Sequence, residues 1–277
     1  MKGKFLAALT LAATLLITGC GGGGDTPAKT DDKSAAKEVT LKIGATPVPH
    51  SEILAEITPD LKEKGIKLEV IEFNDYVQPN IALNDKELDA NFFQHEPYLN
   101  DFVKEHKDVK LKNAGGVHIE PMSIYSKKIK DLKELADGAT VSIPNDPTNG
   151  GRALLLLQKA GLLKLKDGVN EMATVQDIVE NPKNLKIQEV EAAQLPRTLE
   201  DVDISIINTN FAMNADLNPM KDALFIEDKT SPYVNIIAVR EGDENREEIK
   251  TLLNVIKTDK VKKFIEEKYK GAIVPAF

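Results

Sequence analysis

Apolar and polar residues alternate with period two in several short segments, and each of these segments is followed by a longer one with helical periodicity. Residues 39–45 and 66–73 alternate as half-buried strands do, and residues 51–64 between them form an amphipathic helical pattern that Gly65 ends. The next three segments predict a helix, a strand and a helix, at residues 77–83, 88–93 and 96–105. This β-α-β-α-β order predicts a parallel sheet with helices on its faces.

A second unit of the same kind starts after residue 125. The pattern predicts strands at residues 139–143, 185–190, 204–207, 224–226 and 233–240, and helices at residues 151–160, 244–256 and 259–269. Two such units predict an α/β fold with two lobes, each a sheet flanked by helices, joined by chain crossings near residues 122–125 and 233–239. We assign residues 39–122 and 239–277 to lobe 1 and residues 123–238 to lobe 2. A cleft between the lobes is the favoured ligand site, because strand carboxyl ends and helix N-termini face it.

The N-terminal pattern is that of a lipoprotein signal peptide over residues 1–19. Lys2 and Lys4 precede an apolar stretch at residues 5–18, which is shorter than the about 20 residues that a membrane-spanning helix needs. Small residues before Cys20 are typical of a lipobox, whose cysteine becomes the lipidated N-terminus after cleavage. A buried free cysteine is the alternative, but nothing around Cys20 would bury it. Residues 20–38 then supply the lipidated Cys20 and a glycine-rich, flexible tether, so we expect a protein held on the extracytoplasmic face of the cell membrane.

Charge and motifs narrow the class of protein further. Removal of residues 1–19 reduces the basic residues from 36 to 34 against 44 acidic ones, a net charge of −10, and no nucleic-acid partner is expected. With Cys20 lipidated, no disulfide or thiol nucleophile remains. The sequence contains no Gly-x-Ser-x-Gly, no phosphate-binding loop and no His-Glu-x-x-His. We therefore expect a binding protein without a cofactor rather than an enzyme.

Polar and aromatic residues gather where the predicted strands end, which makes them candidates for the ligand site. They are Tyr76, Phe93, His95, Asn149, Arg152, Asn208, Asn210 and Asn235. A guanidinium near the start of the predicted helix at 151–160 would receive a carboxylate well, although Arg152 could instead be a surface arginine that answers a nearby acid. Asn235 lies in the otherwise apolar stretch YVNIIAV, where a buried amide needs either a ligand or a backbone partner. The set suits a small zwitterion with an apolar tail.

Several of these residues have a second interpretation. One of Asn208 and Asn210 is expected to cap the helical pattern that begins at Phe211, while the other points into the cleft. His95 could cap the helix that follows it instead of joining Tyr76 and Phe93 in a wall for an apolar or thioether tail. Strand alternation sends Phe92 away from Phe93 and into the core.

The four histidines leave a metal-binding alternative open. His50, His95 and His118 would have to converge with a carboxylate such as Glu120, because these histidines lack the short spacing of common zinc motifs. We otherwise expect His50 to lie at the rim of the cleft.

Seven segments resemble those of the methionine-binding lipoproteins of ABC importers, the MetQ/NlpA family. They are GATPVPHSEIL, FNDYVQPNIAL, DANFFQHEPYL, SIPNDPTNGGRALLLLQKAGLL, IVENPKNLKI, EAAQLPRTLEDVDISIINTNFA and SPYVNIIAVR, and the resemblance spans residues 41–277. It implies a two-lobed, periplasmic-binding-protein-like fold that passes methionine, L-methionine first, to a membrane permease and its ATPase. It also implies a monomer that carries a lipid with palmitate at Cys20.

The resemblance further implies a set of ligand residues. Arg152 would bind the carboxylate, Asn208 and Asn235 the amino and carboxylate groups, and Tyr76, Phe93 and His95 the thioether tail. Asn149 and Asn210 are secondary members of the set. Asn210 is expected either to contact the ligand or to cap a helix. A zinc-binding lipoprotein and a surface adhesin that keeps the fold are the alternatives.

Overall fold

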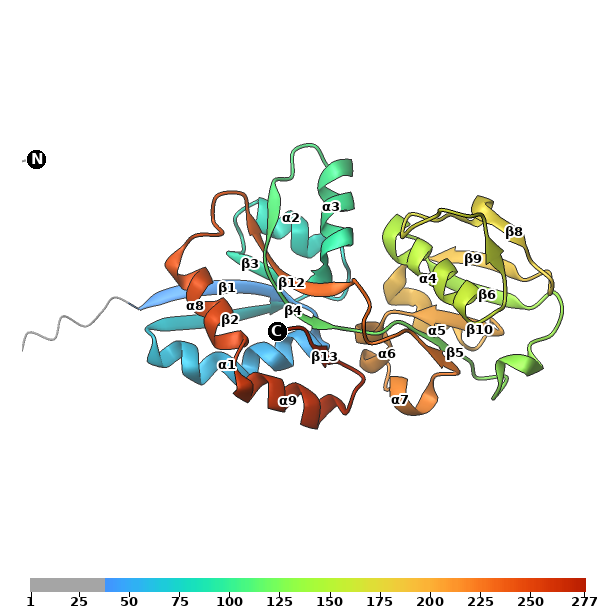
Figure 1. Cartoon of the computed structure of the whole chain (residues 1–277). Coiled ribbons are helices and arrows are strands. Elements are labelled where there is room, and N and C mark those ends of the chain that lie inside the picture. Colours follow the sequence, from blue (N-terminus) through green and yellow to red (C-terminus); the bar gives the residue numbers. More distant parts are fainter. Residues whose placement is uncertain (1–37) are drawn as a thin grey trace, which may run out of the picture. The chain divides into compact units, whose positions relative to one another are not determined.

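The computed structural model describes residues 38–277, which fold as two lobes (Figure 1). The expected signal peptide, Cys20 and all of the tether except its last residue lie outside the described residues. The sheet of lobe 1 has six strands in the order β13-β4-β12-β3-β1-β2, and the sheet of lobe 2 has five in the order β11-β5-β10-β6-β9. A two-lobed α/β architecture, as the sequence predicts, is confirmed.

The sheet of lobe 1 is mixed rather than parallel. Its strands are β1 (Val39–Ala45), β2 (Ile66–Glu72), β3 (Ala90–His95), β4 (Leu111–Ile119), β12 (Val234–Arg240) and β13 (Val274–Pro275). The predicted β-α-β-α-β segment is parallel, with β1 between β2 and β3. However, β12 runs antiparallel to both β3 and β4, and β13 antiparallel to β4. The expectation of a parallel sheet is therefore wrong for the half of the sheet that leads to and returns from lobe 2.

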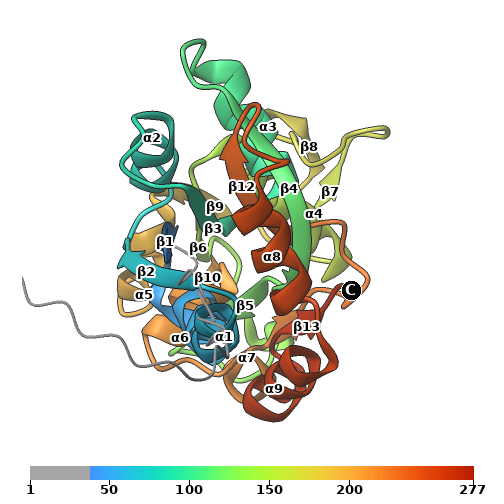
Figure 2. The same cartoon turned by 90° about the vertical axis from the view of Figure 1, so that its left-hand side faces the viewer.

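Helices cover both faces of this sheet (Figure 2). They are α1 (Glu52–Glu63), α2 (Gln78–Asn84), α3 (Glu96–Glu105), α8 (Glu247–Ile256) and α9 (Asp259–Tyr269), and a short turn, η1 (Pro47–Ser51), precedes α1. Ile237 of β12 packs into the core with α1, α8 and α9, whereas its neighbour Ile236 packs with α2 and α3. Side chains of a strand point alternately to the two faces, so one apolar stretch serves two cores.

Lobe 2 has the same layered construction. Its sheet contains β5 (Ser123–Tyr125), β6 (Thr140–Pro144), β9 (Lys186–Val190), β10 (Ile204–Ile207) and β11 (Phe225–Ile226), and a separate pair is formed by β7 (Lys164–Leu165) and β8 (Ile178–Glu180). The helices are α4 (Pro147–Lys159), α5 (Leu195–Thr198), α6 (Thr209–Asn214) and α7 (Pro219–Asp222), with 3₁₀ turns η2 (Leu132–Glu134), η3 (Val175–Asp177) and η4 (Ala192–Gln194). The α4 side chains Leu154 and Leu157 form one core with Ile206, and the helices after β9 and β10 form another with Ile207.

The chain passes between the lobes twice. The first passage lies between β4 and β5, close to the expected crossing near 122–125. The second lies between β11 and β12, and all of β12 pairs within the sheet of lobe 1. We therefore place the second crossing before Val234, which moves most of β12 out of the lobe 2 assigned from the sequence as 123–238. The reason is that the hydrogen-bonding partners of β12 are β3 and β4, and pairing of this kind is invisible in a local apolar pattern.

Candidate functional site

One pocket between the lobes brings together all eight residues that the sequence singles out. Its lining includes Tyr76, Phe93, His95, Asn149, Arg152, Asn208, Asn210 and Asn235. The free volume left between these side chains is about 20 Å³, which is room for about one water molecule. Lobe 1 supplies the aromatic side chains and Asn235, and lobe 2 supplies the arginine and the other asparagines.

Hydrogen bonds cross the pocket from lobe to lobe. The Tyr76 hydroxyl donates to Oδ1 of Asn210 at 2.6 Å, and Nε2 of His95 lies 3.0 Å from Oδ1 of Asn149. Asn149 follows Asp146, the N-cap of α4, whose carboxylate accepts from the Asn149 backbone N–H. The helix cap formed by Asp146 therefore fixes the position of Asn149, which is the residue that bonds His95.

Arg152 is buried, with 3% of its side chain exposed, and it lies in the second turn of α4. The helix begins at Pro147, so the expectation that Arg152 sits at its N-terminus is wrong. Its Nε donates to Glu227 Oε1 at 3.1 Å, its Nη2 donates to the other carboxylate oxygen, and Nη2 also donates to the backbone oxygen of Glu120 at 2.8 Å. The guanidinium carbon lies 4.2 Å from the centre of the Tyr233 ring. Arg152 thus has the acidic partner that the alternative interpretation expected, but it is buried and is not a surface arginine.

Asn208 and Asn210 have roles different from those that the sequence suggests. The helix α6 begins at Thr209 rather than at Phe211, and Asn208 occupies its N-cap position without a side-chain cap bond. Asn208 instead donates from Nδ2 to Oδ1 of Asn149 at 2.8 Å. Asn210 lies inside the helix, so the interpretation of Asn210 as its cap is wrong. Within the described residues, Oδ1 of Asn208 and Nδ2 of Asn210 are buried without hydrogen-bond partners, which is costly unless a polar group meets them.

His95 is both a helix cap and a pocket residue. Its Nδ1 accepts from the backbone N–H of Tyr98 at 3.2 Å at the start of α3, while Nε2 faces Asn149. Burial, with a smaller contribution from the charge of Arg152, lowers the pKa of His95 to about 3. The imidazole is therefore neutral at neutral pH.

Aromatic rings also line the pocket. The ring of Tyr76 lies 5.7 Å from that of Phe93, 5.6 Å from that of Tyr98 and 4.7 Å from that of Phe211. Burial raises the pKa of the Tyr76 phenol well above its ordinary value. Phe92, as expected from strand alternation, faces the opposite core and is fully buried there.

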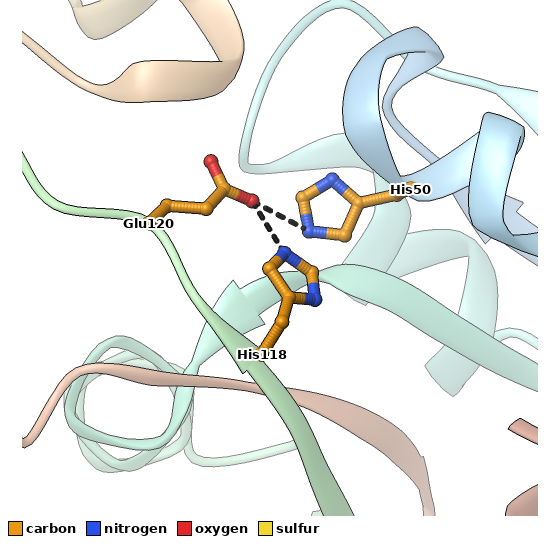
Figure 3. Close-up of side chains that lie close together, drawn as sticks. All are labelled: His50, His118 and Glu120. Carbon is orange, nitrogen blue, oxygen red and sulfur yellow. Dashed lines mark hydrogen bonds and ion pairs between the residues drawn. The ribbon is translucent and has the colours of Figure 1, made fainter. Parts of the chain in front are cut away.

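Beside the pocket, His50, His118 and Glu120 form a buried cluster (Figure 3). Both Nε2 atoms approach Glu120 Oε1, at 3.2 Å from His50 and 2.8 Å from His118. His50 Nε2 also lies 3.0 Å from Oδ1 of Asn235. The metal-binding alternative expected His95 here as well, but His95 bonds Asn149 and is not part of the cluster. His50 is fully buried, so its expected position at the cleft rim is also wrong.

The electrostatics of this cluster follow from its burial. Burial lowers the pKa of His50 to about 4 and that of His118 to about 3. Burial also raises the pKa of Glu120, and the charges of His50 and Arg152 oppose that shift.

We expect acidification to destabilise the protein. His50, His95 and His118 have folded-state pKa values below the ordinary 6.5, so the unfolded chain binds more protons than the folded one below that pH. The three neutral histidines contribute fully to the free energy of unfolding above about pH 6.5. This contribution is lost as the pH falls toward 3–4, by up to about 1.4 kcal/mol per pH unit for each histidine. The raised pKa of Glu120 acts in the opposite direction nearer pH 4.5. Urea unfolding should show a smaller free energy at pH 5.5 than at pH 7.5; an equal or larger value would contradict this.

Sequence reasoning missed four further lining residues and one partner of the site. Gln94, Tyr98 and Thr209 line the pocket, and so does Glu120, which the sequence raised only as a metal ligand. Glu227 was missed because it lies 75 residues from Arg152. A local signal existed for Gln94, because residues 91–95 are a run of polar and aromatic side chains in a strand buried on both faces.

Two α/β lobes that close polar and aromatic side chains around one buried pocket define a two-lobed solute-binding protein. The sequence profile described as NlpA lipoprotein matches residues 41–277. The chain belongs to the NlpA lipoprotein family, as its resemblance to the MetQ/NlpA sequences predicts.

Known relatives resemble this chain over nearly its whole length. It is 46% identical to the methionine-binding lipoprotein MetQ of Bacillus subtilis (strain 168), covering 99% of each chain. It is 45% identical to the D-methionine-binding lipoprotein MetQ of Escherichia coli (strain K12), covering 98% of this chain and 96% of that one. A solved structure, a nutrient-binding protein from Burkholderia cenocepacia bound to methionine, is 50% identical with a TM-score of 0.82, covering 86% of this chain and 100% of the other.

Within residues 38–277 no helix is both long enough and apolar enough to cross a bilayer.

Proposed function

We propose that this protein captures methionine in the pocket between its lobes and delivers it to the permease of an ABC importer. L-methionine is the isomer that we expect it to bind. The observation that carries the proposal is one buried pocket that is lined by an arginine and several amides and also by aromatic rings. The names of the relatives and the methionine-bound Burkholderia structure support the same ligand. The activity is binding, and no reaction is assigned to the pocket.

In this proposal the arginine and amide side chains of the pocket hold the charged groups of the amino acid. Arg152 uses Nε and Nη2 for protein contacts, and Nη1 is the donor directed to the carboxylate. Asn208 and Asn235 bond the amino and carboxylate groups, and the buried Oδ1 of Asn208 suits an ammonium group.

Tyr76, Phe93 and His95 contact the thioether tail, because sulfur packs well against aromatic rings. Asn149 and Asn210 support the site from its edge, since Asn149 bonds His95 and Asn210 bonds Tyr76.

Calorimetry on unfolded and refolded protein tests the proposal, because refolding removes any ligand acquired during expression. Titration with L-methionine should give one site per chain. Two further ligands serve as matched probes. D-methionine tests the arrangement of the charged groups, and norleucine, in which a methylene replaces the sulfur, tests the contribution of the sulfur. Absence of binding for both methionine isomers would refute the proposed function.

We further propose that Cys20 carries the lipid anchor of a monomer on the extracytoplasmic face of the cell membrane. In Cys20→Ser the membrane fraction should lose the protein, while methionine affinity stays within a few-fold of wild type, because the tether expected from the glycine-rich sequence would separate the anchor from the pocket. Fractionation and calorimetry measure the two effects. A loss of affinity greater than tenfold in the soluble variant would contradict an independent tether.

A further inference from the structure

We propose that His50, His118 and Glu120 form a binding site for a divalent transition-metal ion such as Zn²⁺, which adjoins the amino-acid pocket and shares Glu120 with it. The nitrogen and oxygen donors of the three side chains all lie within 4.8 Å of one another (Figure 3). In a tetrahedral zinc site with bonds of about 2.0–2.1 Å, neighbouring donors are roughly 3.3 Å apart. The two separations from Glu120 Oε1, 3.2 Å to His50 Nε2 and 2.8 Å to His118 Nε2, are close to that value.

A fourth donor is already in place. Asn235 Oδ1 lies 3.0 Å from His50 Nε2, on the partner strand of β4 beside His118. Two imidazoles, one carboxylate and one amide oxygen are a donor set that suits zinc better than magnesium or calcium, which prefer oxygen ligands.

The surroundings hold the donors rigidly. Phe92 meets the rings of His50 and His118 edge-on, with centroid distances of 4.6 and 5.3 Å. Thr46 Oγ1 lies 2.6 Å from His50 Nδ1, in the position of the outer-shell partner that usually orients a metal-bound histidine. His118 and Glu120 lie two residues apart, so their side chains leave the chain on the same side.

The polar atoms of the cluster lie close enough together for one cation to contact them. When Nδ1 of His50 donates to Thr46, its Nε2 carries a lone pair that faces two oxygen acceptors, Glu120 Oε1 and Asn235 Oδ1. When Nε2 carries the proton instead, that single proton is shared between both acceptors. A cation between these atoms would accept a lone pair from each of the three at once.

The site adjoins the proposed methionine pocket, because Glu120 and Asn235 line both. An ion can therefore arrive through the cleft between the lobes. It would also engage Asn235, so metal and methionine should weaken each other's binding. This coupling rests on the proposed function, whereas the metal site itself does not.

The test uses the full chain in detergent, freed of ligand and metal by unfolding with a chelator and refolding. Titration with Zn²⁺ in the absence of amino acid should give one ion per chain, and Mg²⁺ should give none. His50→Gln and His118→Gln should each weaken Zn²⁺ binding more than tenfold, whereas His106→Gln, an exposed histidine outside the cluster, should not change it. No stoichiometric Zn²⁺ binding, or an equal loss in His106→Gln, would overturn the proposal.

A second measurement needs no variant and so does not depend on whether the variants fold. Co²⁺ added to wild type should produce the visible absorption of tetrahedral coordination, and Zn²⁺ should abolish it. Only the weak absorption of octahedral, hydrated Co²⁺ would overturn the proposal. Methionine binding measured with and without Zn²⁺ then tests the coupling alone, because its absence leaves the Zn²⁺ and Co²⁺ results intact.

Discussion

Arg152→Ala is expected to weaken methionine binding by about 30-fold to several thousand-fold, because truncation of a buried charge partner typically costs 2–5 kcal/mol. In the proposed site the guanidinium holds the carboxylate inside a pocket where Arg152 itself is 3% exposed. Methionine amide is the matched ligand, since it lacks only the carboxylate charge. Wild type should strongly prefer methionine over the amide, and Arg152→Ala should lose most of that preference.

The ion pair with Glu227 requires its own control. Arg152→Ala also leaves the Glu227 carboxylate without its partner, which is a structural cost separate from ligand contact. Glu227→Gln keeps the arginine and its charge and should retain the preference for the carboxylate. If Arg152→Ala keeps the full preference, or if Glu227→Gln abolishes it to the same extent, Arg152 does not bind the carboxylate directly.

Phe92→Ala is expected to lower the free energy of unfolding by about 3–5 kcal/mol, the usual cost of removing a buried phenylalanine. Phe92 is fully buried in the core of lobe 1, and its ring supports His50 and His118. Its neighbour Phe93 is the matched comparison, since it lies on the other face of β3 and lines the pocket. Urea unfolding and methionine calorimetry measure both variants.

The two variants should differ in affinity more than in stability. Phe93→Ala removes part of the proposed wall for the thioether and should lower methionine affinity more than Phe92→Ala does. The assignment of the two faces of β3 would be contradicted if Phe92→Ala cost less than about 1 kcal/mol, or if it lowered affinity more than Phe93→Ala.

The sequence predicts the fold well wherever a local pattern carries the information. The strand at residues 39–45 and the helices at residues 96–105 and 259–269 have the predicted bounds, because each combines clear periodicity with a recognisable end. The strand β4 was not predicted, since its residues 113–116 are only partly buried and include Gly115 and Gly116. It is held instead by pairing with β12, which lies more than 100 residues further along the chain.

The site is predicted to a similar extent and for similar reasons. Strand ends point to seven of the eight pocket residues, because the ends of parallel strands meet at one edge of a sheet. The eighth, Asn235, was found as an amide within an apolar strand, and that strand is antiparallel to its neighbours. What the sequence does not provide is the choice of partners. The bonds from Arg152 to Glu227 and from His50 to Asn235 join distant segments, and they decide which atoms remain available to a ligand.

The contacts of Arg152 also bear on the entropy of binding. An arginine that is free in solution samples many rotamers, and ordering its side chain costs about 2 kcal/mol. Here the Glu227 carboxylate, the Glu120 backbone oxygen and the Tyr233 ring hold the guanidinium in one orientation. That ordering therefore belongs to the folding of the chain, and a carboxylate that arrives in the pocket meets a donor that is already immobile.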